Sequence, residues 1–311
     1  PYVRIPVGGS NIDPRVSIFW IQDTRTGKSA AYQVIEQILK SSGLNSVDYN
    51  SGNDAALVGT LVPDPDSENP QFPEMKVREG ILGGRKGLNF DEGSVLLKSG
   101  QHNENTTLFL QSALNSVGTG RNILTKHMAR DTFEVESEVS LWITTYPPKG
   151  IKEHVLDKGI FQRVLTYWRN WTLEMKRTVA HELAGAVHNE PEFKVSFDEV
   201  VSHFTALRKR LLDRVLKMTQ LSNLEWDEME TKDQNQLVVT TMRVLFTIDE
   251  TFEPALVTAI DEYYSLIESM HPLKQSVCAS FIMGLQNYTT VLAHHMAMIE
   301  GTWVVRGDHV D

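Results

Sequence analysis

Short apolar runs alternate with longer segments of helical periodicity in the first part of the chain. Residues 16–21 form an apolar run that ends in turn chemistry, as buried parallel strands do. In residues 29–39 the apolar positions recur at helical spacing, and a Ser-Ser-Gly sequence closes the segment. A second short strand is expected near 46–49 and a helix at 54–61, before an exposed loop at 63–72 that is rich in Pro, Asp and Asn.

The middle of the chain contains a strand, a helix and then three more apolar runs. Residues 87–90 form a strand that leads directly into two acidic residues. The other elements expected here are a helix with a glycine stop at 106–117 and strands at 121–128, 132–138 and 139–145. Because only a short polar turn separates the first two of these runs, they predict a hairpin.

From about residue 151 onward the pattern predicts mainly helices. Ser196 and Glu199 have the spacing of a capping box. Long periodic segments follow at 200–219, 253–270 and 273–299. The chain therefore predicts an α/β core with a central parallel sheet in residues 1–175 and a helical lid in residues 176–311.

Composition and charge narrow the class of protein. With 311 residues, 41% of them hydrophobic, the chain suits one large domain or a core domain with an appendage. It has no apolar run long enough to cross a bilayer and no signal-peptide pattern at its start, so we expect a cytoplasmic protein without a membrane partner. The single cysteine, Cys278, excludes an internal disulfide. A net charge of -10 disfavours a DNA-coating protein but leaves room for a local basic strip.

The loop between the first strand and the first helix carries candidate phosphate chemistry. A loop in this position points backbone N–H groups and the positive end of the helix dipole at a polyphosphate. Gly27 permits a close approach, Lys28 reaches the β- and γ-phosphates of ATP, and Ser29 ligates Mg²⁺. Thr24 and Thr26 belong to the same phosphate-binding turn.

This loop departs from the full P-loop pattern G-x-x-x-x-G-K-[ST] at one position, where Gln22 replaces the first glycine. A bare Gly-Lys-Ser tripeptide is equally consistent with a solvent-exposed loop. Its place between an apolar strand and an amphipathic helix favours the P-loop interpretation.

Asp91 and Glu92 lie about sixty residues downstream, directly after another apolar strand. In a P-loop ATPase an acid at this place holds Mg²⁺, and a neighbouring Glu activates the attacking water. We therefore assign Asp91 as the metal acid and Glu92 as the base. An ordinary acidic turn is the alternative for the pair taken alone.

Two further catalytic candidates follow in the chain. Thr144 and Thr145 end the strand at 139–145, which is expected beside the Asp91 strand, and Thr145 is the candidate γ-phosphate sensor. Arg163 is the candidate transition-state cation for the site of a neighbouring subunit, with Arg169 and Arg130 as rivals. Threonines that bond their own turn and solvated surface arginines are the plainer alternatives.

The predicted hairpin carries a cationic cluster in an otherwise acidic chain. Its members are Arg121, Lys126, His127 and Arg130. Such a hairpin could contact DNA phosphates, and a solvated hairpin tip is the alternative. His294 and His295 are interpreted as core or surface residues rather than metal ligands, and the aromatic cluster at 167–171 as packing at helical spacing.

Taken in order, these segments resemble the ring-forming replicative helicases of plasmids and viruses, in the superfamily 3 and MCM-like branch of AAA+ ATPases. The likeness is greatest to phage and bacterial primase-helicase proteins. The segments that carry it are Gly27-Lys28-Ser29, Asp54-Ala55-Ala56-Leu57, Asp91-Glu92-Gly93, the hairpin, Thr144-Thr145-Tyr146-Pro147-Pro148, Gly159-Ile160-Phe161-Gln162-Arg163 and the final stretch 292–310.

The resemblance implies an ATP-hydrolysing motor that uses Mg²⁺ and assembles as a ring, expected to be hexameric. Active sites would lie at subunit junctions, Arg163 would act in trans, and single-stranded or forked DNA would occupy the central channel. Two alternatives remain open. One is a P-loop ATPase that serves as a switch or assembly factor, and the other is a nucleotide-binding module whose site has decayed at Gln22.

Overall fold

The computed structural model of the chain divides into two compact units. The residues that it describes are 5–7, 10–12, 14–23, 26–44, 46–48, 54–67, 71, 74–93, 103–115, 122–128, 131–147, 159–185, 196–229, 233 and 246–310. The α/β unit comprises Ser17–Asn115 and Arg121–Val201. The helical unit comprises Pro1–Val16, Ser116–Gly120 and Ser202–Asp311. The domain division at residue 175 stays a prediction.

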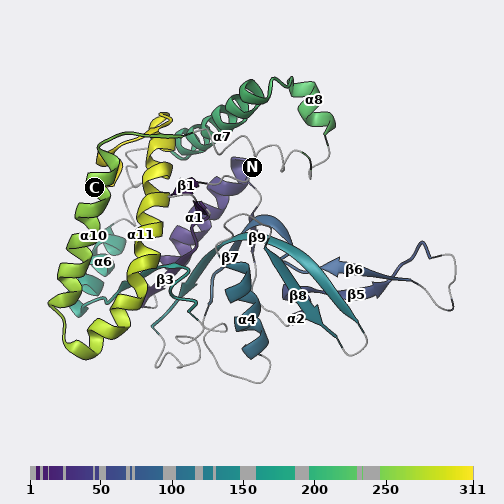
Figure 1. The fold of residues 1–311 in the computed structure, drawn as a ribbon. Helices are drawn as coiled ribbons and strands as arrows, with labels where there is room; N and C mark the ends of the chain where they lie inside the picture. The colour runs from purple at the N-terminus through teal and green to yellow at the C-terminus, as the bar shows by residue number, and fades with distance from the viewer. Residues whose placement is uncertain are drawn as a thin grey trace. The chain divides into compact units, whose positions relative to one another are not determined.

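The α/β unit is built on a sheet of parallel strands, as predicted (Figure 1). In spatial order these strands are β10 (Leu165–Arg169), β3 (Ile18–Gln22), β9 (Thr132–Thr145), β7 (Gly84–Phe90) and β4 (Ser46–Asp48). All four strand pairs along this path are parallel. Their carboxyl ends therefore meet at one edge of the sheet, which is where α/β proteins bind ligands.

One face of this sheet forms the core of the unit. Phe19, Ile143 and Phe90 lie opposite one another on three neighbouring strands, and all three are buried. Because side chains on a strand alternate between faces, the same row arrangement repeats two residues away at Leu141 and Leu88. Each fully buried side chain of this size stabilises the fold by roughly 1.5–3 kcal/mol. This row fixes the register of the three central strands.

The predicted hairpin is present, but its second strand is longer than expected. β8 (Ile123–His127) pairs antiparallel with the first part of β9. The sequence predicted separate strands at 132–138 and 139–145, and this was wrong, since β9 runs without a break from Thr132 to Thr145. Its odd-numbered positions from Phe133 to Thr145 are all buried, so the alternation passes through the expected boundary unchanged.

Two other elements differ from the sequence-based expectation. The helix expected at 54–61 ends early, because α2 (Asp54–Leu57) gives way to β5 (Gly59–Pro63), which pairs with β6 (Met75–Glu79). Gly59 has φ +122°, and a Cβ there would lie 2.5 Å from the Arg78 carbonyl oxygen, so the turn into the ribbon requires glycine. The segment at 165–169 was expected to be helical but is the edge strand β10. Tyr167 and Trp168 therefore have strand spacing.

Of the longer helices of the α/β unit, the first lies within two residues of its predicted position, the second begins and ends three to four residues earlier than predicted, and the third had no predicted bounds. They are α1 (Lys28–Ser41), α4 (Asn103–Ala113) and α6 (Leu173–Gly185). Figure 1 shows the β5–β6 ribbon extending from the sheet on the same side as the β8–β9 hairpin. Lys126 of β8 joins the two, since its Nζ donates a hydrogen bond of 2.9 Å to the Gly59 carbonyl oxygen.

The helical unit confirms the three long helices expected in the second half of the chain. Its elements are β1 (Ile5–Val7), β2 (Ser10–Ile12), α7 (Phe197–Thr219), α8 (Asn223–Glu228), β11 (Thr247–Ile248), α10 (Phe252–Glu268), α11 (Pro272–Glu300), β12 (Val304–Val305) and the 3-10 helix η1 (Gly307–His309). α7 begins just before the boundary between the units, with the predicted capping box formed by Ser196 and Glu199. Both of its hydrogen bonds are present, at 2.8 and 3.2 Å.

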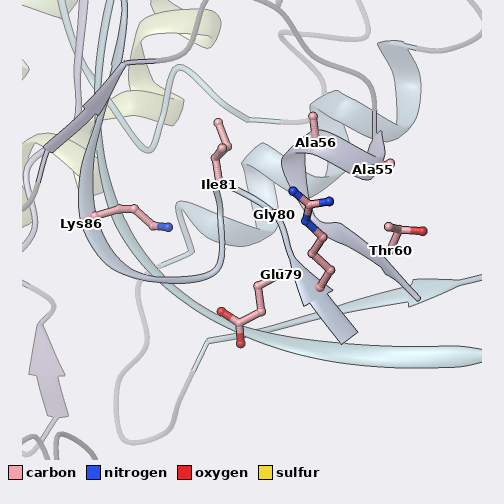
Figure 2. Close-up of a pocket in the computed structure, with 8 residues that line it drawn as sticks. Ala55, Ala56, Thr60, Glu79, Gly80, Ile81 and Lys86 are labelled. Atoms are coloured by element: carbon pink, nitrogen blue, oxygen red, sulfur yellow. The ribbon is translucent and has the colours of Figure 1, made fainter. Parts of the chain in front are cut away.

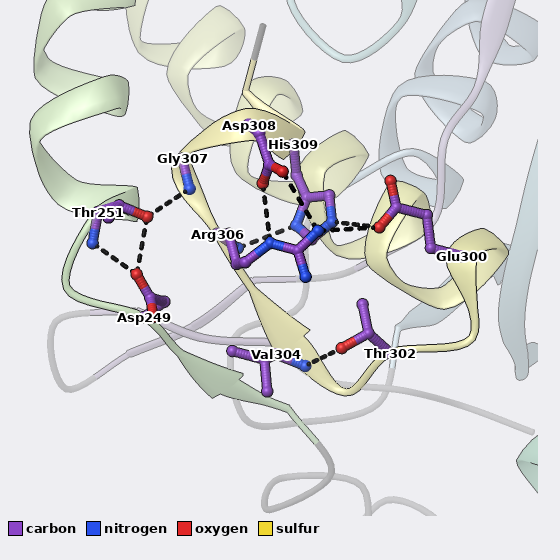
Figure 3. Close-up of polar contacts among 9 residues, drawn as sticks. All are labelled: Asp249, Thr251, Glu300, Thr302, Val304, Arg306, Gly307, Asp308 and His309. Atoms are coloured by element: carbon purple, nitrogen blue, oxygen red, sulfur yellow. Dashed lines mark hydrogen bonds and ion pairs between the residues drawn. The ribbon is translucent and has the colours of Figure 1, made fainter.

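A polar network secures the end of the helical unit (Figure 3). The Gly307 amide donates to Thr251 Oγ1 at 2.9 Å, which ties η1 to the start of α10. Arg306 pairs with Asp308 and Glu300, and the buried His309 ring lies 3.0 Å from the same Glu300 carboxylate. These contacts connect η1 with the start of α10 and the end of α11, so their role is structural.

His294 is a buried residue of α11 and confirms the interpretation as core. Its Nδ1–H donates to the Thr290 carbonyl oxygen at 2.8 Å, and the ring packs against Phe246 and Phe252. Burial lowers the pKa of His294 from its ordinary 6.5 to about 4, with smaller contributions from His295 and His309, despite the opposing hydrogen bond to Thr290. The imidazole is therefore neutral in the folded protein near pH 7.

Acidification should destabilise the helical unit through this residue. Between pH 6.5 and about 4 the unfolded chain binds a proton that the folded chain does not, so stability is lost as pH falls through this window. From pH 7 to pH 5 the free energy of unfolding should drop by about 2 kcal/mol from His294 alone. Urea unfolding at both pH values measures it. His294→Leu should remove this part of the drop, whereas His203→Leu, at an exposed site, should keep it. An equal loss of unfolding free energy between pH 7 and pH 5 in the two variants would contradict the assignment.

Candidate functional site

The candidate site lies at the carboxyl edge of the parallel sheet. Ile21 of β3 is paired with Thr145 of β9, and Phe90 of β7 is paired with Ile143 of β9. The chain leaves β3 through the candidate phosphate loop and leaves β7 through Asp91. As predicted, the strand that ends at Thr145 lies directly beside the Asp91 strand, so β9 stands between the loop and the acids.

The Lys28 side chain folds back over this edge. Its Nζ donates to the carbonyl oxygen of Gln22, to that of Asp23 at 3.4 Å and to that of Thr145 at 3.0 Å. Burial lowers the pKa of Lys28, while the nearby carboxylates of Glu92, Asp23 and Asp91 act to raise it. The ammonium group thus sits among carbonyl dipoles and acids that favour its charged form.

Two buried threonines hold the acidic pair. The Thr145 hydroxyl donates to Glu92 Oε1 at 3.1 Å, and the Thr144 hydroxyl donates to the Asp91 carbonyl oxygen and lies 3.4 Å from Asp91 Oδ1. Thr145 therefore contacts the candidate cation through its carbonyl and the candidate base through its hydroxyl. This single residue links Lys28 and Glu92, which are 64 positions apart in the sequence.

Gly93 explains why the acids lie so close to β9. Its amide donates to the Thr144 carbonyl oxygen at 2.7 Å, and the residue is buried. A Cβ at this position would clash with Ile143 Cγ2, which belongs to a stiff, fully buried side chain. The absence of a side chain at position 93 is therefore needed for Asp91 and Glu92 to approach the threonines.

Gly93→Ala should lower the free energy of unfolding by roughly 1–3 kcal/mol, because the added methyl group overpacks the core against β9. Gly185→Ala is the matched control, since a Cβ at that position, the last residue of α6, meets nothing within 4 Å. Chemical denaturation of both variants checks the difference. Equal stability of the two would show that the chain beside β9 relaxes without cost.

The turn before α1 has the backbone conformation that its glycine allows. Gly27 is the N-cap of α1 and has φ 86° and ψ 4°, in the left-handed region. Inside the turn, the Thr26 hydroxyl donates to the Asp23 carbonyl oxygen at 2.6 Å. Ser29, in the first turn of α1, is exposed. Thr24 lies outside the described residues.

Gln22 has a structural role that the sequence pattern did not indicate. Its side chain is buried, accepts a hydrogen bond of 2.6 Å from Trp20 Nε1 and donates one of 3.2 Å to the Thr26 carbonyl oxygen. The side-chain amide of Gln22 therefore ties the end of β3 to Thr26, at the other end of the turn that wraps around phosphate in a P-loop. Only the contact with Trp20 had a signal in the sequence, because Trp20 and Gln22 share one face of a strand.

Two further contacts at this edge were missed because they join distant segments. Lys176 of α6 forms an ion pair of 2.6 Å with Asp23 of the loop. Tyr32, one turn after Lys28 in α1, donates a hydrogen bond of 2.6 Å to Asp48 at the end of β4, and Asn89 of β7 lies 3.3 Å from the same carboxylate. These contacts hold α1, α6 and the strand ends in one arrangement.

Arg163 lies at the amino ends of the parallel strands, opposite the candidate site. It precedes β10, whose first residue Leu165 is paired with Ile18, whereas the last, Arg169, is paired with Gln22 beside the phosphate loop. The strand between them spans roughly 13 Å. Arg163 Nε donates to Asn115 Oδ1 and its Nη1 to the Gly159 carbonyl oxygen, each at 2.8 Å. It is therefore not brought together with Lys28 within one chain.

The hairpin residues are also separate from the loop. Lys126 and His127 end β8, which pairs with the amino-terminal part of β9, while Thr145 ends the same strand. His127 Nδ1 lies 3.0 Å from Thr132 Oγ1 across the hairpin and is exposed. Arg121 and Arg130 lie outside the described residues.

Within the described part of the chain, no group of three or more His, Cys, Asp or Glu residues is arranged to hold a metal ion. A Mg²⁺ site that uses Ser29 and Asp91 is of a different kind, because Mg²⁺ commonly takes one or two protein ligands and completes its shell with phosphate oxygens and water. No helix among the described residues is both long and apolar enough to span a bilayer. No protein-family model matches this chain, and no curated protein sequence matches it.

Proposed function

We propose that the chain is the core of an ATP-dependent DNA helicase or translocase that works as a ring. The observation that carries the proposal is the double contact of Thr145 with Lys28 and Glu92 at the carboxyl edge of the parallel sheet. A cation from the strand-loop-helix turn after β3 and acids from the end of β7, on the other side of β9, are the groups that hydrolysis of a phosphoanhydride requires.

In this proposal Lys28 exchanges its carbonyl acceptors for the β- and γ-phosphate oxygens of ATP, and the Gly27 turn supplies backbone N–H groups. Ser29 and Asp91 would hold Mg²⁺, which would supply positive charge to neutralise the phosphates. Glu92 accepts a proton from the water that attacks the γ-phosphorus, and the bond to the bridging oxygen of ADP breaks. Thr145 keeps Glu92 oriented through its hydroxyl and senses the γ-phosphate.

Ring assembly is supported by the location of Arg163. Since this residue lies at the amino ends of the strands, away from its own chain's candidate site, it could act only on the site of a neighbouring subunit. A homo-oligomer, expected to be hexameric, would bring it there. Lys126, His127 and Arg130 then offer hydrogen-bond donors to DNA phosphates from the hairpin.

A P-loop switch or assembly factor is the second candidate, and the brace formed by Gln22 favours it. The buried amide ties Thr26 to the strand end, so the turn must reorganise before it can wrap around phosphate. Slow turnover suits a switch more than a motor. In a nucleotide-binding module with a decayed site, the same brace would keep the turn from wrapping around phosphate at all.

Three assays on one preparation separate these functions. Size measurement with and without ATP tests assembly, ATPase measurement with and without single-stranded DNA tests coupling, and displacement of a strand from forked DNA tests movement. We expect an ATP-dependent ring, stimulation by DNA and displacement. A ring that hydrolyses ATP but displaces no strand would favour the switch instead.

A further inference from the structure

A pocket lies at the base of the β5–β6 ribbon, away from the carboxyl edge of the sheet (Figure 2). Its volume is about 490 Å³, within the range of small-molecule sites. Lys86 lines it from β7, five positions before Asp91 and therefore roughly 16 Å from it along the strand. The other lining residues are Ala55, Ala56, Thr60, Arg78, Glu79, Gly80 and Ile81.

The pocket contains two cations without a matching pair of acids. Figure 2 shows the Lys86 side chain extending from β7 toward the pocket, and Arg78 of β6 is another of the lining residues. Among the described residues, neither Lys86 nor Arg78 has an ion pair or a side-chain hydrogen bond. Burial lowers the pKa of Lys86, and the charge of Glu79 offsets only part of this effect. A half-buried ammonium without a hydrogen-bonded partner is costly to the fold.

Glu79 forms no ion pair with Lys86 or Arg78 in the part of the chain that the structure describes. Its carboxylate is packed over Gly83, where an added Cβ would lie 2.8 Å from Glu79 Oε2. The backbone amides beside it are also engaged, because Gly80 donates to Val58 and Ile81 donates to Ala56 through hydrogen bonds of 3.0 and 2.9 Å. Recognition in this pocket therefore falls to the side chains.

We propose that this pocket binds a phosphate group. Arg78 offers a planar fork of N–H donors, Lys86 a compact positive charge and Thr60 a hydroxyl, a donor set that suits tetrahedral phosphate oxygens. Ala55, Ala56 and Gly80 leave the space, and Gly80 must be glycine because a Cβ would clash with the Leu57 carbonyl oxygen. The phosphate belongs either to a free monoester or to the backbone of a nucleic-acid strand.

Binding is measured by calorimetry with inorganic phosphate on the full chain carrying Lys28→Ala, so that the phosphate loop does not contribute. We expect one phosphate per chain with a dissociation constant on the order of 1 mM. Lys86→Met and, separately, Arg78→Gln should each weaken binding roughly tenfold, because each removes a charge-assisted hydrogen bond. Lys76→Met is the matched control, since Lys76 lies on the same ribbon but pairs with Asp64 at 3.1 Å.

Arg78 is exposed, so Arg78→Gln should fold normally and keeps the test valid if Lys86→Met proves unstable. Unchanged affinity in Arg78→Gln, or no saturable binding by the Lys28→Ala chain, would overturn the proposal. Repeating the titrations with AMP and with an oligodeoxythymidine without terminal phosphates identifies the source. If Lys86→Met and Arg78→Gln weaken the binding of AMP alone, the ligand is a monoester. If they weaken the binding of the oligonucleotide, the ligand is a nucleic-acid strand. If they weaken the binding of neither, the proposed site is overturned. Because Lys28 is absent throughout, failure here leaves the proposed ATPase function untouched.

Discussion

Replacing Lys28 with alanine is expected to reduce ATP hydrolysis by a factor on the order of 10² or more. The Glu92 and Asp91 carboxylates act electrostatically on the Lys28 ammonium group at the sheet edge, and hydrolysis needs a positive charge beside the transferring phosphoryl group. Measurement of phosphate release with and without single-stranded DNA checks the effect.

Lys40→Ala is the matched control for this substitution. Lys40 is at the other end of the same helix, is exposed, and pairs with Glu36 and Asp48 rather than with the loop. Its loss should leave hydrolysis unchanged. Full DNA-stimulated activity in Lys28→Ala would remove the loop from the mechanism.

Glu92→Gln should separate nucleotide binding from hydrolysis. The amide keeps an oxygen that can accept the hydrogen bond from Thr145, so the local geometry is retained. An amide cannot take the proton from the attacking water, and loss of a general base costs roughly 10²–10⁴-fold in rate. Nucleotide affinity should stay close to that of the unaltered chain.

Single-turnover hydrolysis and equilibrium binding on the same Glu92→Gln sample check both halves of this expectation. Glu174→Gln, on the exposed surface of α6, is the control for a change of charge alone. If Glu92→Gln hydrolyses ATP at the normal rate, another group acts as the base and Glu92 only orients Lys28.

The elements that the sequence predicted correctly are those with a strong local signal. α1 was placed within two residues at each end, because its apolar positions recur at helical spacing and a glycine turn precedes it. The long helices α7, α10 and α11 carry the same period over many turns. Local periodicity also indicated the parallel sheet, through short apolar runs that end in turn residues.

The elements that were predicted wrongly depend on partners distant in the sequence. β9 runs past the expected boundary because β8, β3 and β7 all pair with it. The number of strands that pair with a segment cannot be predicted from its local sequence pattern. β10 is a strand because β3 offers it an edge, although the residues around Tyr167 also fit a helical pattern. α2 ends at Leu57 because Gly59 must pass against the Arg78 backbone.

The same distinction applies to the candidate site. The sequence indicated that Lys28, Asp91, Glu92 and Thr145 belong together, and the structure brings them to one edge of the sheet. It could not indicate that Gln22 braces the turn, that Lys176 reaches Asp23, or that Gly93 is packed against Ile143. Those contacts depend on tertiary packing.

Calorimetric titration of the unaltered chain with Mg-ATP tests the central claim, that the edge around Lys28 and Thr145 binds nucleotide. We predict one ATP bound per chain with a dissociation constant between about 1 µM and 1 mM, and loss of that binding in Lys28→Ala but not in Lys40→Ala. Absence of saturable binding by the unaltered chain at millimolar ATP, or equal binding by both variants, would contradict it.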